Sequence, residues 1–409
     1  MKKTLIALAA LAATASFAQS SVSIIGTIDL GIKSVSAASA ATGNTATFNN
    51  NASQTAVNTN NTATSALKFI GTEDLGGGMK AGFLMELNPN LANSTTTNLS
   101  TSAASAYTGT PFNGEQFLSL GGNFGEVKLG NPNAGFYGAV STASPLGTGM
   151  ASGYSTSFGR LGGATPLTTG FGGSTSAYGT NFPGIGSDIG GTAGSRIIRH
   201  DRTVQYTTPV FSGFKATFDY SAGNDNSATP TSNTDTYAGV ALTYSKGALN
   251  VAYAYANTKF GTLPVAFATM LGSPAAVTST TIGVNGTDLT NHVLAANYNF
   301  GAATVYGGYT ISKSNNPGTA FLDDKSWNIA GKYAVGSNIE LVANYLVRTS
   351  DVSVVNNAKV YGGGADYILS KRTNLYARYE LIDVNTDSKF ATPGGSITNA
   401  FALGVKHTF

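Results

Sequence analysis

Apolar and polar residues alternate with a period of two through most of this chain. In the first run, Ile28 and Ile32 fall on one side, whereas Asp29 and Lys33 fall on the other. A period of two is the signature of a β-strand with one apolar face. Sixteen such segments lie near residues 22–33, 67–74, 79–87, 116–120, 126–129, 197–208, 214–221, 237–244, 249–256, 292–300, 303–311, 327–335, 339–348, 359–369, 374–384 and 398–409. The chain is therefore predicted to be all-β.

The connections between these segments alternate in length. Short glycine-containing turns exchange with long polar loops, the first of which is expected to run to about Ser65. Short turns at one end and long loops at the other are typical of outer-membrane barrels. In such a barrel, lipid covers the apolar face of each strand, water fills the channel, and closure satisfies every backbone polar group. The prediction is a sixteen-stranded antiparallel transmembrane β-barrel, and not a soluble two-domain protein.

The N-terminus has the features of a secretory signal peptide. Lys2 and Lys3 precede a short apolar run, and small residues before Gln19 fit a signal-peptidase site. We expect residues 1–18 to be removed and residues 19–409 to form one barrel domain. Removing the two lysines lowers the 23 basic residues to 21, against 20 acidic ones. This balance excludes the basic surface that a nucleic-acid-binding protein needs.

The stretch from residue 131 to residue 195 is long and irregular in pattern. It is rich in glycine and serine and also in aromatic residues, and its only charges are Arg160 and Asp188. Irregular stretches of this length are usually functional or disordered, and disordered segments are poor in aromatic residues. A wide barrel has a lumen that such a loop can fill. We expect residues 131–195 to fold inward as a constriction loop; the alternative is an exposed glycine-rich surface loop.

Five short motifs occur in order along the chain. They are residues 28–31 (IDLG), 71–80 (GTEDLGGGMK), 206–213 (YTTPVFSG), 370–376 (SKRTNLY) and 404–409 (GVKHTF). With these motifs in this order, the whole chain resembles the trimeric general diffusion porins of Gram-negative bacteria, in particular the proteobacterial branch that includes the neisserial porins.

The resemblance implies a homotrimer of barrels in the outer membrane, each with its third long loop folded inward. It implies contacts with outer-membrane lipid and lipopolysaccharide, and recognition of the terminal Phe409 by the barrel assembly machinery. It also implies passive diffusion of ions and small hydrophilic solutes.

The chain departs from the resemblance in the charges of the constriction. Asn131 stands where the family often has arginine, and Ala66 and Ile70 flank Lys68 at positions where arginine is common. Asp188 is the only carboxylate that the inward loop offers. The transverse field that the resemblance implies is therefore expected to be weak or rearranged.

Strand parity identifies the candidate charges of the channel wall. The inward-facing candidates are the bases Lys33, Lys68, Arg199, Arg348 and Arg378 and the acids Asp29, Glu86, Asp201, Asp219 and Glu380. Parity puts Arg202 on the lipid side, where a charge costs about 2–4 kcal/mol, so we expect a bulge or a shielded position there. Because only Asp188 opposes Arg160 in the loop, the wall bases should dominate the narrow zone. This predicts a mild anion preference that fades with salt.

No motif indicates catalysis, a cofactor or a metal site. His200, His292 and His407 lie on different expected strands, and a zinc site needs three or four convergent ligands. The glycine runs at 76–78 and 362–364 lack the strand–loop–helix context of a phosphate site. We expect a passive, non-enzymatic pore. The alternatives are a substrate-specific channel for sugars or organic anions, and a plugged barrel that serves as an adhesin or anchor.

Overall fold

The computed structural model describes most of the chain. The described residues are 21–39, 53–89, 91–92, 112, 114–147, 149–151, 198–222, 236–260, 287–315, 323–351, 358–384 and 396–409. The strands are β1 (Ser21–Ser39), β2 (Ser53–Thr59), β3 (Ala66–Gly76), β4 (Met79–Leu87), β5 (Gln116–Gly122), β6 (Gly125–Asn131), β7 (Thr203–Thr207), β8 (Phe214–Ser221), β9 (Thr236–Lys246), β10 (Leu249–Phe260), β11 (Thr287–Asn299), β12 (Ala303–Asn315), β13 (Asp323–Val335), β14 (Ile339–Ser350), β15 (Ala358–Ile368), β16 (Thr373–Val384) and β17 (Ser396–Thr408). Helix α2 (Gly135–Ser141) follows β6.

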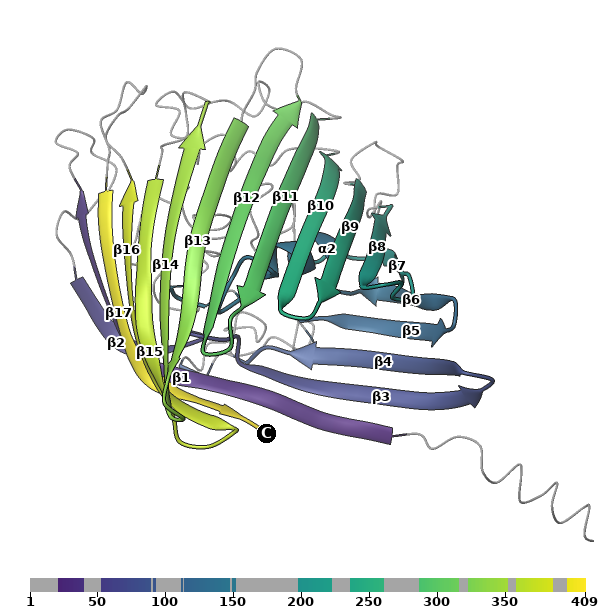
Figure 1. The fold of residues 1–409 in the computed structure, drawn as a ribbon, viewed down its shortest axis with the longest axis horizontal. Helices are drawn as coiled ribbons and strands as arrows, with labels where there is room; N and C mark the ends of the chain where they lie inside the picture. Colours follow the sequence, from purple (N-terminus) through teal and green to yellow (C-terminus); the bar gives the residue numbers. More distant parts are fainter. Residues whose placement is uncertain are drawn as a thin grey trace, which may run out of the picture.

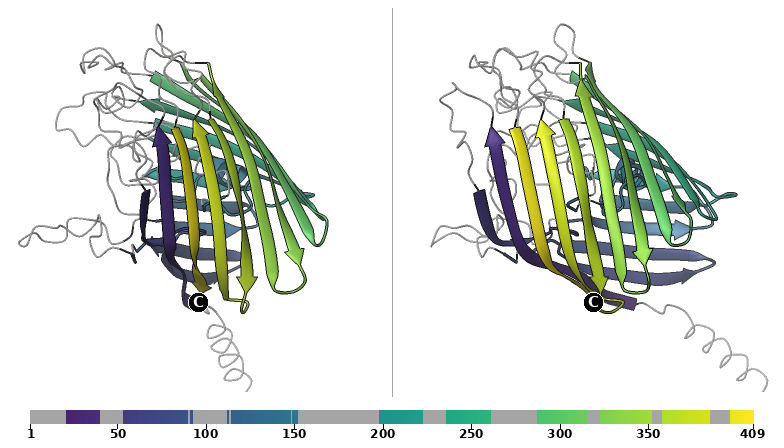
Figure 2. Two further views of the ribbon diagram at one scale, coloured as in Figure 1. Left: turned by 90° about the vertical axis from the view of Figure 1, so that its left-hand side faces the viewer. Right: turned by 60° about the vertical axis from the view of Figure 1, so that its left-hand side comes forward.

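The sheet closes into a barrel. From β3 onward, each strand pairs antiparallel with the next, and β17 returns to pair with β1 (Figures 1 and 2). On its other edge, β1 pairs with β3 through its first part and with β2 through its second part. β2 and β3 are therefore two halves of one barrel strand. The predicted sixteen-stranded antiparallel barrel is confirmed.

The exposure of side chains alternates along the strands as the sequence predicts. On β14, Leu341 is 42% exposed on the outer face, whereas Arg348 is 1% exposed on the inner face. On β16, Leu375 and Tyr379 are exposed and Arg378 is buried. Large apolar side chains thus face outward around the barrel, and the buried polar groups face the lumen. This arrangement suits a wall with lipid outside and water inside.

The predicted loop up to Ser65 is wrong in part, because residues 53–59 form β2. This segment has only one large apolar residue, Val57, so the alternation that marks the other strands is too weak to detect. Backbone pairing with β1 forms the strand, with Val57 opposite Ile32 and 60% exposed on the outer face.

Two further differences concern the region after β6. The expected irregular stretch from residue 131 begins with the last residue of β6 and then forms α2. The expected strand over residues 197–208 is shorter, because only Thr203–Thr207 are in β7. Residues 152–197 lie outside the described part of the chain. Among the described residues, no helix is long and apolar enough to span a membrane.

Candidate channel constriction

The chain enters the lumen directly after β6. Helix α2 packs against β8, β9, β10 and β11 of the inner wall (Figure 1). After the helix, Asn297 Nδ2 on β11 donates to the carbonyl oxygen of Thr142 at 2.9 Å. Asn328 Nδ2 on β13 donates to the carbonyl oxygen of Ala143, also at 2.9 Å. Residues 132–151, here called the inner loop, thus cross the inner face of the wall.

Two wall carboxylates accept backbone N–H groups at the two ends of this loop. Gly135 N donates to Asp219 Oδ2 at 2.8 Å, and Ala151 N donates to Glu380 Oε2 at 3.1 Å. Asp219 also accepts Gln205 Nε2 at 2.7 Å. Both carboxylate residues are buried, and a buried charge is costly unless it is hydrogen-bonded. The carboxylates and the loop therefore hold each other in place.

Two glycines of the wall leave room for the loop to approach. A Cβ at Gly308 on β12 would lie 2.6 Å from Ala143 Cβ. A Cβ at Gly362 on β15 would lie 2.6 Å from Ala151 Cα. Both separations are far shorter than an ordinary van der Waals contact. A side chain at either position would push the loop away from the wall.

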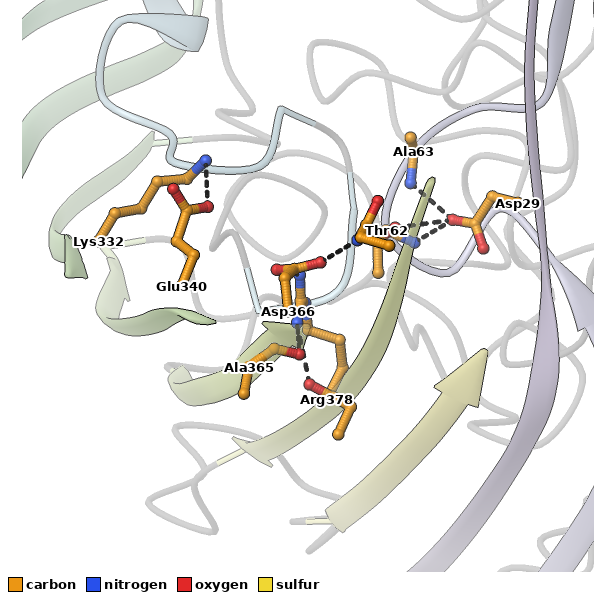
Figure 3. A network of polar contacts seen from close by, with 10 residues as sticks. Asp29, Thr62, Ala63, Lys332, Glu340, Ala365, Asp366 and Arg378 are labelled. Carbon is orange, nitrogen blue, oxygen red and sulfur yellow. Dashed lines mark hydrogen bonds and ion pairs between the residues drawn. The ribbon is translucent and has the colours of Figure 1, made fainter. Parts of the chain in front are cut away.

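Three of the predicted wall bases lie on alternate strands of one part of the wall and are buried. Lys33 on β1, Arg348 on β14 and Arg378 on β16 are each no more than 2% exposed. Lys33 and Arg378 both stand opposite Ala402 of β17, so they flank this small residue at one level of the barrel. Arg378 also forms an ion pair with Asp366 (Figure 3).

Lys68 lies beside one of the predicted wall acids. Its Nζ lies 3.1 Å from Glu86 Oε2, because the two residues are opposite each other in the β3–β4 register. The predicted wall base Lys68 and the predicted wall acid Glu86 therefore form an ion pair. A further lumen ion pair joins Lys332 and Glu340 at 3.0 Å (Figure 3).

The remaining predicted site residues lie around the entry of the loop. Arg199 is buried, and its Nη1 donates to Asn133 Oδ1 at 2.9 Å. Asn131 is the last residue of β6, and its buried Oδ1 has no hydrogen-bond partner among the described residues. Arg160 and Asp188 lie outside the described residues.

The prediction that Asp201 lies on a wall strand is wrong. Asp201 and Arg202 form an exposed turn before β7. Arg202 has a φ of 56°, which interrupts the extended backbone. The strand parity that placed its side chain toward lipid therefore does not apply at this position.

The C-terminal residue closes the barrel. Phe409 N donates to the Gly26 carbonyl oxygen at 3.0 Å, and Gly26 N donates to the Phe409 carbonyl oxygen at 3.1 Å. A Cβ at Gly26 would lie 2.4 Å from the Phe409 ring. The recognition of Phe409 by assembly machinery remains a prediction.

Sequence reasoning missed several residues that hydrogen-bond to the inner loop or to the predicted wall charges. Glu115 Oε1 accepts Asn133 N at 2.9 Å, next to the start of the inner loop. Tyr376 OH donates to Asp29 Oδ1 at 2.5 Å, across β17. The sequence contained one signal for Tyr376, since Gly31 and Gly404 lie at positions where a side chain would collide with its hydroxyl group.

The described residues contain no group of three side chains that could hold a metal ion. The histidines lie in separate places: His200 stacks on Tyr237, with ring centroids 3.6 Å apart, and His407 contacts Phe409 at the barrel closure. His292 Nδ1 lies 3.0 Å from Tyr253 OH. These positions give no convergent set of ligands.

Comparison with known proteins places this geometry among bacterial porins. A family model described as Gram-negative porin matches residues 4–387. Outer membrane porin protein 32 of Delftia acidovorans is 29% identical over 350 residues, which cover 85% of this chain and 82% of the relative. The relatives are channels and not enzymes.

Solved structures show the same fold. The anion-selective porin from Comamonas acidovorans matches with a TM-score of 0.67 at 24% identity, covering 96% of this chain and 100% of that one. OmpF of Salmonella typhi matches with a TM-score of 0.59 at 13% identity, covering 95% and 97% of the two chains. OmpT of Vibrio cholerae, solved in a trimer form, has a TM-score of 0.55 at 13% identity and covers 95% and 99%.

Proposed function

The chain belongs to the Gram-negative porin family, and from this premise we propose how its channel selects solutes. It is an outer-membrane β-barrel through which ions and small hydrophilic solutes diffuse passively. Residues 131–195 constrict this channel, and the constriction favours anions. The inner loop supports the first part of this proposal, because its hydrogen bonds run to lumen-facing side chains of β8, β11, β13 and β16.

Two observations carry the anion preference: wall carboxylates bind backbone N–H groups of the segments that enter the lumen, and two wall bases stand together at one level. The carboxylates of Asp29, Asp219 and Glu380 accept backbone N–H groups of inward segments. The dipoles of these N–H groups offset part of the negative charge toward the passage. Lys33 and Arg378 stand together at one level, where one carboxylate, Asp366, forms an ion pair with Arg378. A charge in a narrow, partly desolvated passage acts more strongly than in bulk water.

The solved anion-selective porin from Comamonas acidovorans supports the same direction of selectivity. That protein is 24% identical to this chain. The proposed preference for anions therefore rests on the wall residues named above.

Zero-current potentials across a KCl gradient test the proposal. Purified protein in planar bilayers should give stepwise ohmic conductance and a potential of the sign that marks anion preference. The potential should shrink as salt rises, because the Debye length falls from about 10 Å at 0.1 M to about 3 Å at 1 M. Lys33→Gln should weaken the preference. Lys246→Gln, at the exposed end of β9, serves as the control and should leave it unchanged.

Two results would contradict this function. A potential of the opposite sign would place the dominant charges elsewhere. Absence of conductance at every voltage, together with absence of solute-induced liposome swelling, would favour a plugged barrel.

We also infer that three barrels associate. The trimer form of OmpT from Vibrio cholerae supports this, as does the shared fold. The outer faces of the first and last strands are the proposed contact region.

A further inference from the structure

The second barrel strand is interrupted in its middle. β3 pairs with β1 up to Ala66 opposite Thr27, and β2 pairs with β1 from Thr59 opposite Leu30. The six residues 60–65 therefore stand opposite only two residues of β1, Ile28 and Asp29. A continuous ladder would hold two residues here, so four are extra. Asn60 has a φ of 61°, a backbone conformation that asparagine tolerates better than most residues. We call residues 60–65 the strand-break segment.

The carboxylate of Asp29 holds this segment on the lumen side of the wall. Its Oδ2 accepts Thr62 N at 2.5 Å, Thr62 Oγ1 at 3.0 Å and Ala63 N at 2.8 Å (Figure 3). The backbone of Asp29 is engaged as well, since its N–H donates to Ser65 Oγ at 3.0 Å and its carbonyl oxygen accepts Asn60 N at 3.2 Å. Asp29 has no exposed surface.

A second strand anchors the same segment. Tyr376 on β16 donates to Asp29 Oδ1, and Asn61 Nδ2 donates to Tyr376 OH at 3.0 Å. The tyrosine reaches this position because Gly31 and Gly404 carry no side chain: a Cβ at Gly404 would lie 2.2 Å from its hydroxyl oxygen. The glycines, the tyrosine and the aspartate therefore form a built site for the strand-break segment.

The strand-break segment in turn supports the end of the inner loop. Met150 N donates to the Asn61 carbonyl oxygen at 2.7 Å. Gly149 packs so closely that a Cβ there would lie 2.3 Å from the Thr62 carbonyl oxygen. Met150 also packs with Tyr376 in a buried apolar cluster that includes Ala400 and Ala402.

From these contacts we propose that the strand-break segment is a second constriction element, and that Asp29 positions it and, through it, the end of the inner loop. Asp29 thus sets the width of the channel and limits fluctuations of its constriction, and does not select ions by its charge. This inference rests on the proposed function, since it needs a conducting pore. It assigns to Asp29 a role different from the pore-lining charge expected from strand parity.

Single-channel recording of four proteins tests the role of Asp29. Asp29→Asn removes the charge and one acceptor oxygen, whereas Tyr376→Phe removes the hydrogen bonds of its hydroxyl group to Asp29 and Asn61 and no charge. Both should raise the open-channel noise and the frequency of subconductance steps severalfold, and both should raise the mean conductance. Glu340→Gln is the matched control, because it removes a lumen carboxylate that is paired with Lys332 of the neighbouring wall strand. It should leave the open-channel noise and the frequency of subconductance steps unchanged, as in the wild type.

A deletion tests the segment itself. Removing four residues, 61–64, would restore a continuous ladder between β1 and the second strand. The shortened protein should still show the heat-dependent gel mobility of a closed barrel, and its conductance should exceed that of the wild type. If it fails to fold, the two point variants still decide the question.

The outcomes separate the two levels of the argument. Wild-type protein that does not conduct overturns the proposed function. This inference is overturned if the wild type conducts, Tyr376→Phe leaves the noise and the conductance unchanged, and Asp29→Asn shifts only the zero-current potential. Asp29 would then be a selectivity charge. Unchanged conductance in a folded deletion protein overturns the role of the strand-break segment.

Discussion

At the scale of single residues, the channel interior depends on glycines as much as on charges. Gly362 faces the lumen from β15 and accommodates Ala151, whose φ of 62° is unusual for a residue with a side chain. Gly362→Ala should displace the end of the inner loop toward the centre of the lumen, weaken the Ala151–Glu380 hydrogen bond and lower the single-channel conductance. Overpacking of this kind destabilises by about 1–3 kcal/mol, so the thermal midpoint in detergent should fall as well. Gly363→Ala is the control, since its Cβ would meet only the Val342 carbonyl oxygen, at 3.5 Å. Equal conductance in the two variants would contradict a role of Gly362 in seating the loop.

At the scale of elements, the sequence predicts those strands in which lipid and lumen faces differ in polarity. β14 and β16 are examples, because their outward residues are large and apolar and their inward residues are polar or charged. β2 escapes detection because pairing with β1, and not side-chain pattern, forms it. Helix α2 escapes for a related reason: a seven-residue helix containing two glycines is unstable alone, and contacts with β8–β11 stabilise it.

The same reasoning limits prediction of the candidate site. Parity predicts that Lys68 and Glu86 share a face, but only the register brings them to 3.1 Å. The contact between Tyr376 and Asp29 joins residues 347 positions apart, so the alternation within either strand cannot indicate that the two side chains meet.

A loop deletion tests the inner loop as an element. Removing residues 147–186 would eliminate the hydrogen bonds of Met150 to Asn61 and of Ala151 to Glu380. The pore should widen, and single-channel conductance should rise well beyond the spread among wild-type channels. The zero-current potential should also move toward zero, because a wider passage weakens the influence of wall charges. Unchanged conductance would mean that the deleted residues lie outside the narrow part of the channel.

At the scale of the whole molecule, a closed barrel has no free sheet edge, so association of protomers must use outward side chains. The outward face of β1 carries Ile24, Ile28 and Ile32, all well exposed in the single barrel. Identical subunits usually assemble with closed cyclic symmetry. We therefore expect unheated protein to migrate above its monomer mass on a denaturing gel, and light scattering in detergent to give three times the protomer mass.

A pair of matched variants locates the contact. Ile32 on β1 and Leu294 on β11 are similarly exposed, at 58% and 55%, but lie on different parts of the wall. Burying a polar amide without a partner in a protein interface costs about 1–3 kcal/mol, so Ile32→Gln should convert the trimer to monomers at a lower temperature than the wild type needs. Leu294→Gln should lower the unfolding temperature of the barrel as much as Ile32→Gln does, because both variants expose glutamine on the outer wall. It should leave the temperature at which the trimer dissociates near that of the wild type. Dissociation temperatures from gel mobility, compared with the barrel unfolding temperatures of the same samples, separate the two effects. A trimer equally stable in the two variants would place the interface away from β1, and a wild-type monomer in detergent would contradict the trimer.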